Sequence, residues 1–240
     1  MAWEPPEGMD EYLRATELCD CDNTELQHNA REIAGDADTA KEAAKRIFYF
    51  VRDEVPFGLD FADAKASHTL RKRIGFCMTK TNLQIALLRA VGIPARCHYS
   101  LVPKSLSKHI IPKLMYNSMP MAVGHPWCEC YLSGRWISCE ALADKPYHEG
   151  RLKFGAFTRE EMPTIDWDGE VDLILYKPWL LEYVGVFPSW DDALMQAGKR
   201  REGRPPKNRL LGCLGFWLMN RRISQFRQLA GSSTYEWSHN

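Results

Sequence analysis

The sequence lacks the long hydrophobic run that a membrane-spanning helix requires. Its longest uncharged apolar stretch, LLGCLGFWLM at residues 210–219, is far shorter than the roughly 20 residues of a span. The first residues, MAWEPPEGMDEY, are acidic and contain no apolar core of the kind found in secretory signals. We therefore expect a cytoplasmic protein.

Paired C-x-x-C motifs and internal repeats are also missing. The eight cysteines include two C-x-C pairs, but this spacing does not match that of structural zinc sites. Without a secretory signal, we expect reduced thiols rather than a disulfide framework, and neither a metal nor a cofactor. The formal net charge is zero, which gives no electrostatic reason to expect nucleic acid as a partner.

The balanced total charge hides a basic C-terminal tail. Residues 199–240 carry nine Lys or Arg against two Glu, so the remainder of the chain is acidic. Within this tail, 197–208 is typical of a basic linker and 209–229 of an amphipathic helix. Its apolar side consists of Leu210, Leu214, Trp217 and Leu218. Its basic residues, expected to face outward, are Arg209, Arg221, Arg222 and Arg227.

Three roles are open for this terminal helix. It can dock on the acidic body of the protein, pair with another subunit, or make a weak contact with an anionic membrane surface. The complementary charge of the body favours docking.

The 240 residues are enough for one full core and an extension. We expect a core over residues 1–150 and a C-terminal extension over 151–240, either part of the same domain or appended to it. The core opens with two expected helices, a short one that ends in a turn at Gly35 and a longer one over 39–53.

A cysteine stands at the start of a segment that is apolar on most sides. Residues 78–91 have helical periodicity, and Gly92 followed by Pro94 ends the pattern, which predicts a buried helix. Cys77 then faces the positive end of the helix dipole and free backbone N–H groups, which favour the nucleophilic thiolate. A structural cysteine fits the same position, so this segment alone leaves the role of Cys77 open.

The second feature is a β-hairpin over residues 125–140. HPWCECYL and RWISCE are typical of two strands joined at Ser133-Gly134. Because strand side chains alternate, His125 and Trp127 are expected on one face, with Glu140 opposite or diagonal to His125.

This hairpin places a carboxylate within reach of an imidazole. Glu140 would orient His125 and stabilise its imidazolium, and we expect the Nε2 atom of His125 to face Cys77. Asp144 lies past the second strand, where strand pairing no longer holds it near the histidine. We therefore expect Glu140 rather than Asp144 to be the acid.

The long connection 103–124 leads directly into His125. It exceeds the about 12–15 residues usual for a passive loop, so we expect it to supply substrate specificity. Met115, Met119 and Met121 are expected to line an adaptable apolar substrate site, together with Trp127 of the hairpin. The alternative is a surface excursion that packs its own methionines.

The two segments together resemble the transglutaminase-like superfamily. GFCMTKTNLQIALLRAVGIPAR, residues 75–96, and HPWCECYLSGRWISCE, residues 125–140, follow its order of motifs. That order is a Gly-x-Cys helix, a Gly-Ile-Pro-Ala-Arg exit, His-x-Trp-x-Glu, a Gly-x-Trp hairpin and an acid. The resemblance covers about residues 25–145 and implies an α+β, papain-like fold with the nucleophile helix packed on an antiparallel sheet.

The resemblance also implies a catalytic triad with Cys77 as nucleophile, His125 as general base and acid, and Glu140 as the acid position. Members transfer acyl groups from amide or ester carbonyls through an acyl-thioester, which water or an amine resolves. They include protein cross-linkers, peptidases, peptide N-glycanases and small-molecule acyltransferases.

Two departures from the family pattern are visible. The usual acid is Asp, whereas this chain has Glu140, which is one methylene longer. Animal members place a Trp upstream of the cysteine to help bind the oxyanion, and no Trp lies between Trp3 and Cys77 here. The Cys77 backbone N–H is expected to supply one oxyanion donor.

The leading interpretation is a cysteine acyltransferase or amide hydrolase with a peptide, amide or small-molecule acyl substrate. The alternative is a non-catalytic module that uses the fold for binding or scaffolding, although such a module has no chemical need for all three polar groups. A zinc-linked peptide N-glycanase would need the paired C-x-x-C motifs that are missing.

Overall fold

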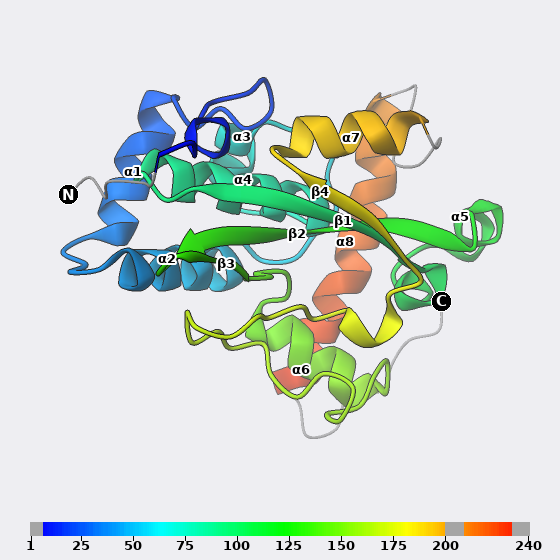
Figure 1. The fold of residues 1–240 in the computed structure, drawn as a ribbon. Helices are drawn as coiled ribbons and strands as arrows, with labels where there is room; N and C mark the ends of the chain where they lie inside the picture. Colours follow the sequence, from blue (N-terminus) through cyan, green and yellow to red (C-terminus); the bar gives the residue numbers. More distant parts are fainter. Residues whose placement is uncertain (1–6, 200–208, 232–240) are drawn as a thin grey trace.

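A four-stranded antiparallel sheet forms the centre of the molecule. The computed structural model describes residues 7–199 and 209–231. The strands lie in the order β3-β2-β1-β4. They are β1 (Ala95–Pro103), β2 (Ala122–Leu132), β3 (Arg135–Ser138) and β4 (Glu182–Phe187). Helix α4 (Cys77–Ala90) packs against β1 and β2 and lies behind the sheet in Figure 1. The expected α+β architecture, with a cysteine helix on an antiparallel sheet, is confirmed.

The remaining helices surround this centre. The α-helices are α1 (Thr24–Ala34), α2 (Ala40–Tyr49), α3 (Ala66–Lys72), α5 (Lys113–Ser118), α6 (Lys145–Phe154), α7 (Trp190–Lys199) and α8 (Arg209–Gly231). Short helical turns are η1 (Asp10–Tyr12), η2 (Phe50–Glu54, π-helical), η3 (Lys104–Ser107) and η4 (Lys177–Trp179). Gly35 has a φ of 58° between α1 and α2, as the predicted turn requires.

Local signals set both ends of α4. Before it, Phe76 is extended and its N–H donates to Thr79 Oγ1 at 3.1 Å. After it, Gly92 has a φ of 84°, and the N–H of Ile93 donates to the Leu88 carbonyl at 2.9 Å, a Schellman arrangement. The side chains from Met78 to Arg89 are buried, so this helix is enclosed and presents its first residue at the surface of the core.

A buried lysine connects α4 to η2. Lys80 is 1% exposed, and its Nζ donates to the carbonyls of Arg52 at 3.2 Å and Val55 at 2.7 Å. Burial disfavours the ammonium and lowers the pKa of Lys80 to about 7. The π-helical end of η2 leaves backbone carbonyls without helical hydrogen-bond donors, and the Lys80 ammonium supplies those donors. Lys80 lies one helical turn after Cys77.

The segment beyond residue 150 is built into the sheet region. Strand β4 pairs with β1, and Leu173 forms a parallel bridge with Cys139. The N–H of Leu173 donates to the Ser138 carbonyl at 2.9 Å, and the N–H of Glu140 donates to the Leu173 carbonyl at 3.1 Å. Of the predicted linker, 197–199 belong to α7, and 200–208 lie outside the described residues.

Helix α8 docks on the body through a face other than the predicted one. Its buried residues are Gly212, Met219, Ile223 and Phe226, and it packs on α6. The expected apolar side is exposed: Leu210, Leu214, Trp217 and Leu218 have exposed fractions of 82%, 57%, 57% and 46%. The helical periodicity of the sequence predicted where this helix lies along the chain. It could not predict which face of the helix packs on α6. No helix within 7–199 or 209–231 has the length and apolarity to cross a membrane.

Arg227 was also expected to face outward, and this expectation is wrong. Its guanidinium lies against the buried Asp144 carboxylate, with Nε 2.9 Å from Oδ1 and Nη2 2.6 Å from Oδ2. The same Nη2 donates to the Phe57 carbonyl at 2.7 Å. Burial opposes ionisation of Asp144, but the Arg227 charge outweighs it and lowers the pKa of the carboxyl.

Arg227→Ala should lower the free energy of unfolding by roughly 2 kcal/mol, because it removes the charged partner of a buried carboxylate. Chemical denaturation with a spectroscopic readout measures this. Arg221→Ala is the matched control, since Arg221 lies on the same helix with an exposed side chain and should cost less than about 0.5 kcal/mol. Equal losses in the two variants would contradict the assigned contact.

Candidate active site

Cys77, His125 and Glu140 meet at the N-terminus of α4. His125 Nε2 lies 2.9 Å from Glu140 Oε1, and the Cys77 side chain is close enough to the same imidazole to raise its pKa. The histidine is 1% exposed and the glutamate 3% exposed, whereas Cys77 is half-buried. A thiol, an imidazole and a carboxylate therefore lie in a row, with the thiol at the accessible end.

Strand register brings Glu140 to His125. Strands β2 and β3 pair Tyr131 with Trp136 and Glu129 with Ser138, and the N–H of Cys139 continues the ladder to the Cys128 carbonyl at 2.9 Å. The turn at Ser133-Gly134 has positive φ at both residues, 50° and 82°. The same register places Glu140 diagonal to His125, as the hairpin prediction allowed.

The nitrogen expected to face Cys77 is the wrong one. Nε2 of His125 is bound to Glu140, so Nδ1 is the nitrogen left for the sulfur. The hairpin register brings His125 and Glu140 into contact, but the register does not fix the orientation of the ring. That orientation depends on the direction from which β3 and Glu140 approach the strand that carries the histidine.

The extension holds Glu140 in place. Its Oε2 accepts a hydrogen bond from the backbone N–H of Leu175 at 2.6 Å, so both carboxylate oxygens have partners. Asp144, the other candidate acid, is engaged elsewhere: it caps α6 through the Tyr147 N–H at 3.1 Å and binds the Phe57 N–H at 2.8 Å. The structure therefore pairs His125 with Glu140 and uses Asp144 as a structural anchor.

The surroundings of His125 favour its charged form. Burial disfavours the imidazolium, but the charge of Glu140 and hydrogen bonds with Cys77 and Glu140 outweigh it and raise the pKa of His125 to about 10. In general, an imidazolium close to a thiol favours the nucleophilic thiolate by direct attraction. At neutral pH this arrangement holds a charged histidine beside the thiol.

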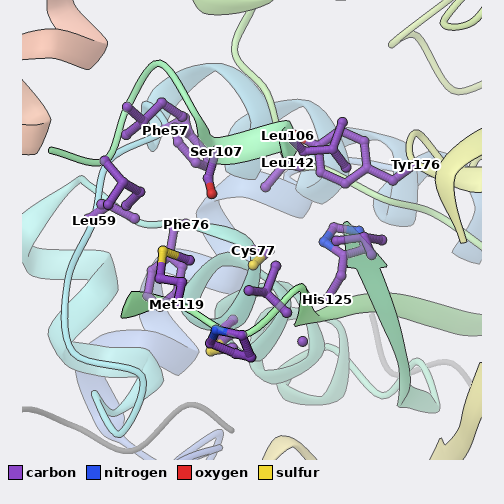
Figure 2. A pocket seen from close by; sticks show the side chains of 17 residues that line it. Phe57, Leu59, Phe76, Cys77, Leu106, Ser107, Met119, His125, Leu142 and Tyr176 are labelled. Atoms are coloured by element: carbon purple, nitrogen blue, oxygen red, sulfur yellow. The ribbon is translucent and has the colours of Figure 1, made fainter. Parts of the chain in front are cut away.

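Cys77 and His125 line a cavity of about 430 Å³. In Figure 2, Cys77 lies in the middle of the lining, between Phe57 and Leu59 on one side and His125 and Tyr176 on the other. Eight of the 17 lining residues belong to the connection 103–124, which supports a role for that connection in binding. Those eight are Leu106, Ser107, Ile110, Ile111, Met119, Pro120, Val123 and Gly124.

Of the four residues predicted to bind substrate, one lines the cavity and three lie outside its lining. Met119 lines the cavity, whereas Met115 and Met121 are outside its lining and are 46% and 75% exposed. Trp127 is also outside it and 2% exposed; its ring stacks on His98 and its Nε1 donates to Ser138 Oγ at 3.1 Å. The alternation of side chains along the strand correctly placed Trp127 on the same face of the sheet as His125. Neighbouring strands, however, bury that part of the face.

No pattern in the sequence indicated Tyr176, which lines the cavity, or Arg151, which holds it. The ring of Tyr176 packs on His125 with centroids 4.7 Å apart, and its hydroxyl accepts from Arg151 Nη1 at 3.0 Å. Arg151 also donates to the Leu106 carbonyl at 2.9 Å. The stretch LILYKPW around Tyr176 is aromatic and apolar, but no spacing relates it to a hairpin more than thirty residues earlier.

The described parts of the chain contain no group of three or more His, Cys, Asp or Glu side chains placed to hold a metal ion. Cys128 and Cys130, one of the C-x-C pairs, are fully buried in the core.

A fold with a cysteine at the start of a buried helix, facing a histidine on an adjacent antiparallel sheet, is a cysteine-type catalytic fold. Residues 27–141 match the model of the Transglutaminase-like superfamily. This stretch, which contains Cys77, His125 and Glu140, is transglutaminase-like. No curated protein matches the chain.

Two solved structures are similar to this protein. A putative cysteine protease from Cytophaga hutchinsonii is 19% identical with a TM-score of 0.51, over 79% of this chain and 50% of that chain. A putative protease from Parabacteroides distasonis is 13% identical with a TM-score of 0.39, over 58% of this chain and 27% of that chain. The similarity to the first supports the fold, and this chain spans about half of that protein's length.

Iodoacetamide should alkylate Cys77 at pH 6 at least about ten times faster than Cys213, because an ordinary thiol is under about 1% thiolate at that pH. Cys213 is the internal control, since it is an exposed cysteine of the same chain. Peptide mass spectrometry measures the two rates. As the pH rises through about 8.5, where an ordinary thiol ionises, the advantage of Cys77 should shrink and the two rates should converge.

His125→Asn should remove most of the advantage of Cys77 at pH 6 without changing the rate at Cys213. If Cys77 kept its advantage in this variant, the helix terminus rather than the histidine would be the cause.

Proposed function

We propose that this protein is a cysteine-nucleophile enzyme that cleaves an amide or ester carbonyl through an acyl-thioester on Cys77. The observation that carries this proposal is the contact of His125 Nε2 with Glu140 Oε1 at 2.9 Å, beside a cavity whose wall contains both His125 and Cys77. This grouping supports acyl transfer or hydrolysis.

In the first step the Cys77 thiolate attacks the carbonyl carbon and a C–S bond forms. The electron pair of the carbonyl moves to oxygen, where the backbone N–H of Cys77 at the start of α4 is the proposed donor. The intermediate collapses, and Nδ1–H of His125 gives its proton to the departing amine or alkoxide. Cys77 then carries the acyl group as a thioester.

In the second step His125, now neutral, accepts a proton from water or an amine. The activated acceptor attacks the thioester carbonyl, the C–S bond breaks, and the thiolate and the imidazolium are restored. Glu140 remains ionised throughout and holds the ring through Nε2–H. Hydrolysis and transfer differ only in the acceptor, so the same residues serve both.

A non-catalytic binding module is the competing proposal. The half-buried thiol beside a charged histidine favours an enzyme, because a binding module gains nothing from that pair. Incubation with p-nitrophenyl acetate tests the difference. An enzyme of this type should release a burst of nitrophenol and gain one acetyl group, located on Cys77 by intact-mass and peptide analysis.

Cys77→Ala should abolish both the burst and the added mass while the protein stays folded, because only a small side chain is lost. Circular dichroism and the unfolding midpoint supply the folding control. A burst of the same size in the folded Cys77→Ala protein would rule out the proposed nucleophile.

Glu140→Gln should reduce the acylation rate by about 10²–10⁴-fold with a small change in KM, because the amide cannot hold the imidazolium. Glu129→Gln is a matched control: Glu129 lies 2.9 Å from Nε2 of His98 on the same sheet, but this pair does not touch Cys77. Rates come from the nitrophenol burst at several substrate concentrations. If both variants lost activity equally, the effect would lie in the sheet and not in the triad.

A further inference from the structure

We propose that the acyl group accepted by Cys77 is an uncharged, mainly hydrocarbon chain that lies in the cavity beside the thiol. The proposal rests on the proposed function, because it names the substrate class of that site. It is carried by the composition of the cavity wall, by the partners of its few polar groups, and by the contacts that hold the wall.

The wall is almost entirely apolar. None of the described residues that line the cavity is a Lys, Arg, Asp or Glu. Apart from Cys77 and His125, the side chains with polar atoms are Ser107 and Tyr176. Away from His125, a substrate side chain with a charge or a terminal amide would lose its hydration against the apolar wall without gaining a polar partner, which disfavours its binding.

The two remaining polar groups are already engaged by the protein. Ser107 Oγ donates to the Lys104 carbonyl at 2.8 Å within η3. The Tyr176 hydroxyl accepts from Arg151 Nη1 at 3.0 Å. The polar chemistry of the cavity is therefore concentrated at Cys77 and His125, where the carbonyl of a substrate would react, and the rest of the wall suits a hydrocarbon.

One side of the wall is fixed by the C-terminal helix. The N–H of Leu59 donates to Asn220 Oδ1 at 2.6 Å, and Asn220 Nδ2 donates to the Leu59 carbonyl at 3.1 Å. Phe57 is held through its own N–H and carbonyl by Asp144 and Arg227. Two of the large apolar side chains that would contact the chain are thus set before binding, which reduces the ordering cost.

Other parts of the wall are adaptable. Met119, Ile110 and Val123 come from the connection and the start of β2, and Met78 is on α4 next to the nucleophile. Methionine side chains adjust to irregular apolar ligands. A volume of about 430 Å³ falls in the usual range for a small-molecule site, so a chain of medium length fits better than an acetyl group or a folded peptide.

The experiment compares the p-nitrophenyl esters of acetate, butyrate, hexanoate and octanoate with the wild-type protein at monomeric ester concentrations. The value of kcat/KM should rise about four-fold for each added methylene until the cavity is full, as burial of one CH₂ group predicts. The p-nitrophenyl monoester of succinate, which carries a carboxylate, should react more slowly than butyrate. A flat series, or a preference for the succinate ester, would overturn the proposal.

Two cavity-filling variants test where the chain lies. Met119→Trp and Val123→Phe should shift the preferred ester to a shorter acid and lower the octanoate-to-butyrate ratio at least about ten-fold. Leu114→Trp is the matched control, because Leu114 is close in sequence but 85% exposed and outside the lining. An unchanged ratio in both filling variants, each shown to be folded, would place the chain elsewhere.

A binding measurement separates this proposal from the proposed chemistry. Calorimetry with 2-butanone and 2-octanone on folded Cys77→Ala reports on the cavity without any reaction. If octanone bound more tightly than butanone but the p-nitrophenyl esters did not acylate the wild-type protein, the hydrocarbon site would stand and Cys77 would be rejected as the nucleophile. If p-nitrophenyl acetate acylated the wild-type protein but octanone bound no more tightly than butanone, Cys77 would remain the nucleophile and the hydrocarbon site would be rejected.

Hydrocarbon acyl chains occur in soluble esters and thioesters and also in membrane lipids. Vesicles of phosphatidylcholine, assayed for released fatty acid, distinguish the two sources. Release from vesicles assigns the substrate to lipid, whereas turnover of the monomeric octanoate ester alone assigns it to a soluble molecule; both results support the chain assignment.

Discussion

The hydrogen bond between His125 and Glu140 is the contact on which the rest of the site depends. Both side chains are buried, so each charge needs a partner that water cannot replace. Glu140 receives one from His125 and a second from the Leu175 N–H, and the ring of His125 lines the cavity beside Cys77. Helix α4, the β2–β3 hairpin and the extension must therefore all be in place before the imidazolium is stable.

This requirement explains why the site combines a charged row with an apolar cavity. Attraction between charges is stronger where water is excluded, so an apolar wall strengthens the pairing of the imidazolium with its neighbours. The ring of Tyr176 covers His125 on the cavity side and is itself fixed by Arg151. The same exclusion of water that stabilises this row makes the cavity suitable for hydrocarbon and unsuitable for charged groups.

The sequence predicted the parts of this structure that local signals determine. Gly92 and Pro94 ended α4, Ser133-Gly134 located the hairpin, and alternation along the hairpin brought His125 and Glu140 together. It could not predict contacts between distant segments, because no period or spacing relates them. The packing face of α8, the burial of Trp127 beside His98 and the roles of Leu175 and Tyr176 all depend on which surfaces meet in three dimensions.

We propose that the segment matched by the superfamily model and the rest of the chain have different roles. The match to the superfamily ends at residue 141, and it contains Cys77, His125 and Glu140. The groups that hold this row and shape the cavity from outside the match are Arg151, Leu175, Tyr176, Asn220 and Arg227. Proteins can share the cysteine, histidine and acid and still differ in these supports, since an extension can change its contacts without disturbing the strand register. The identity of the substrate should accordingly follow the extension and the connection 103–124, while the type of reaction follows the core.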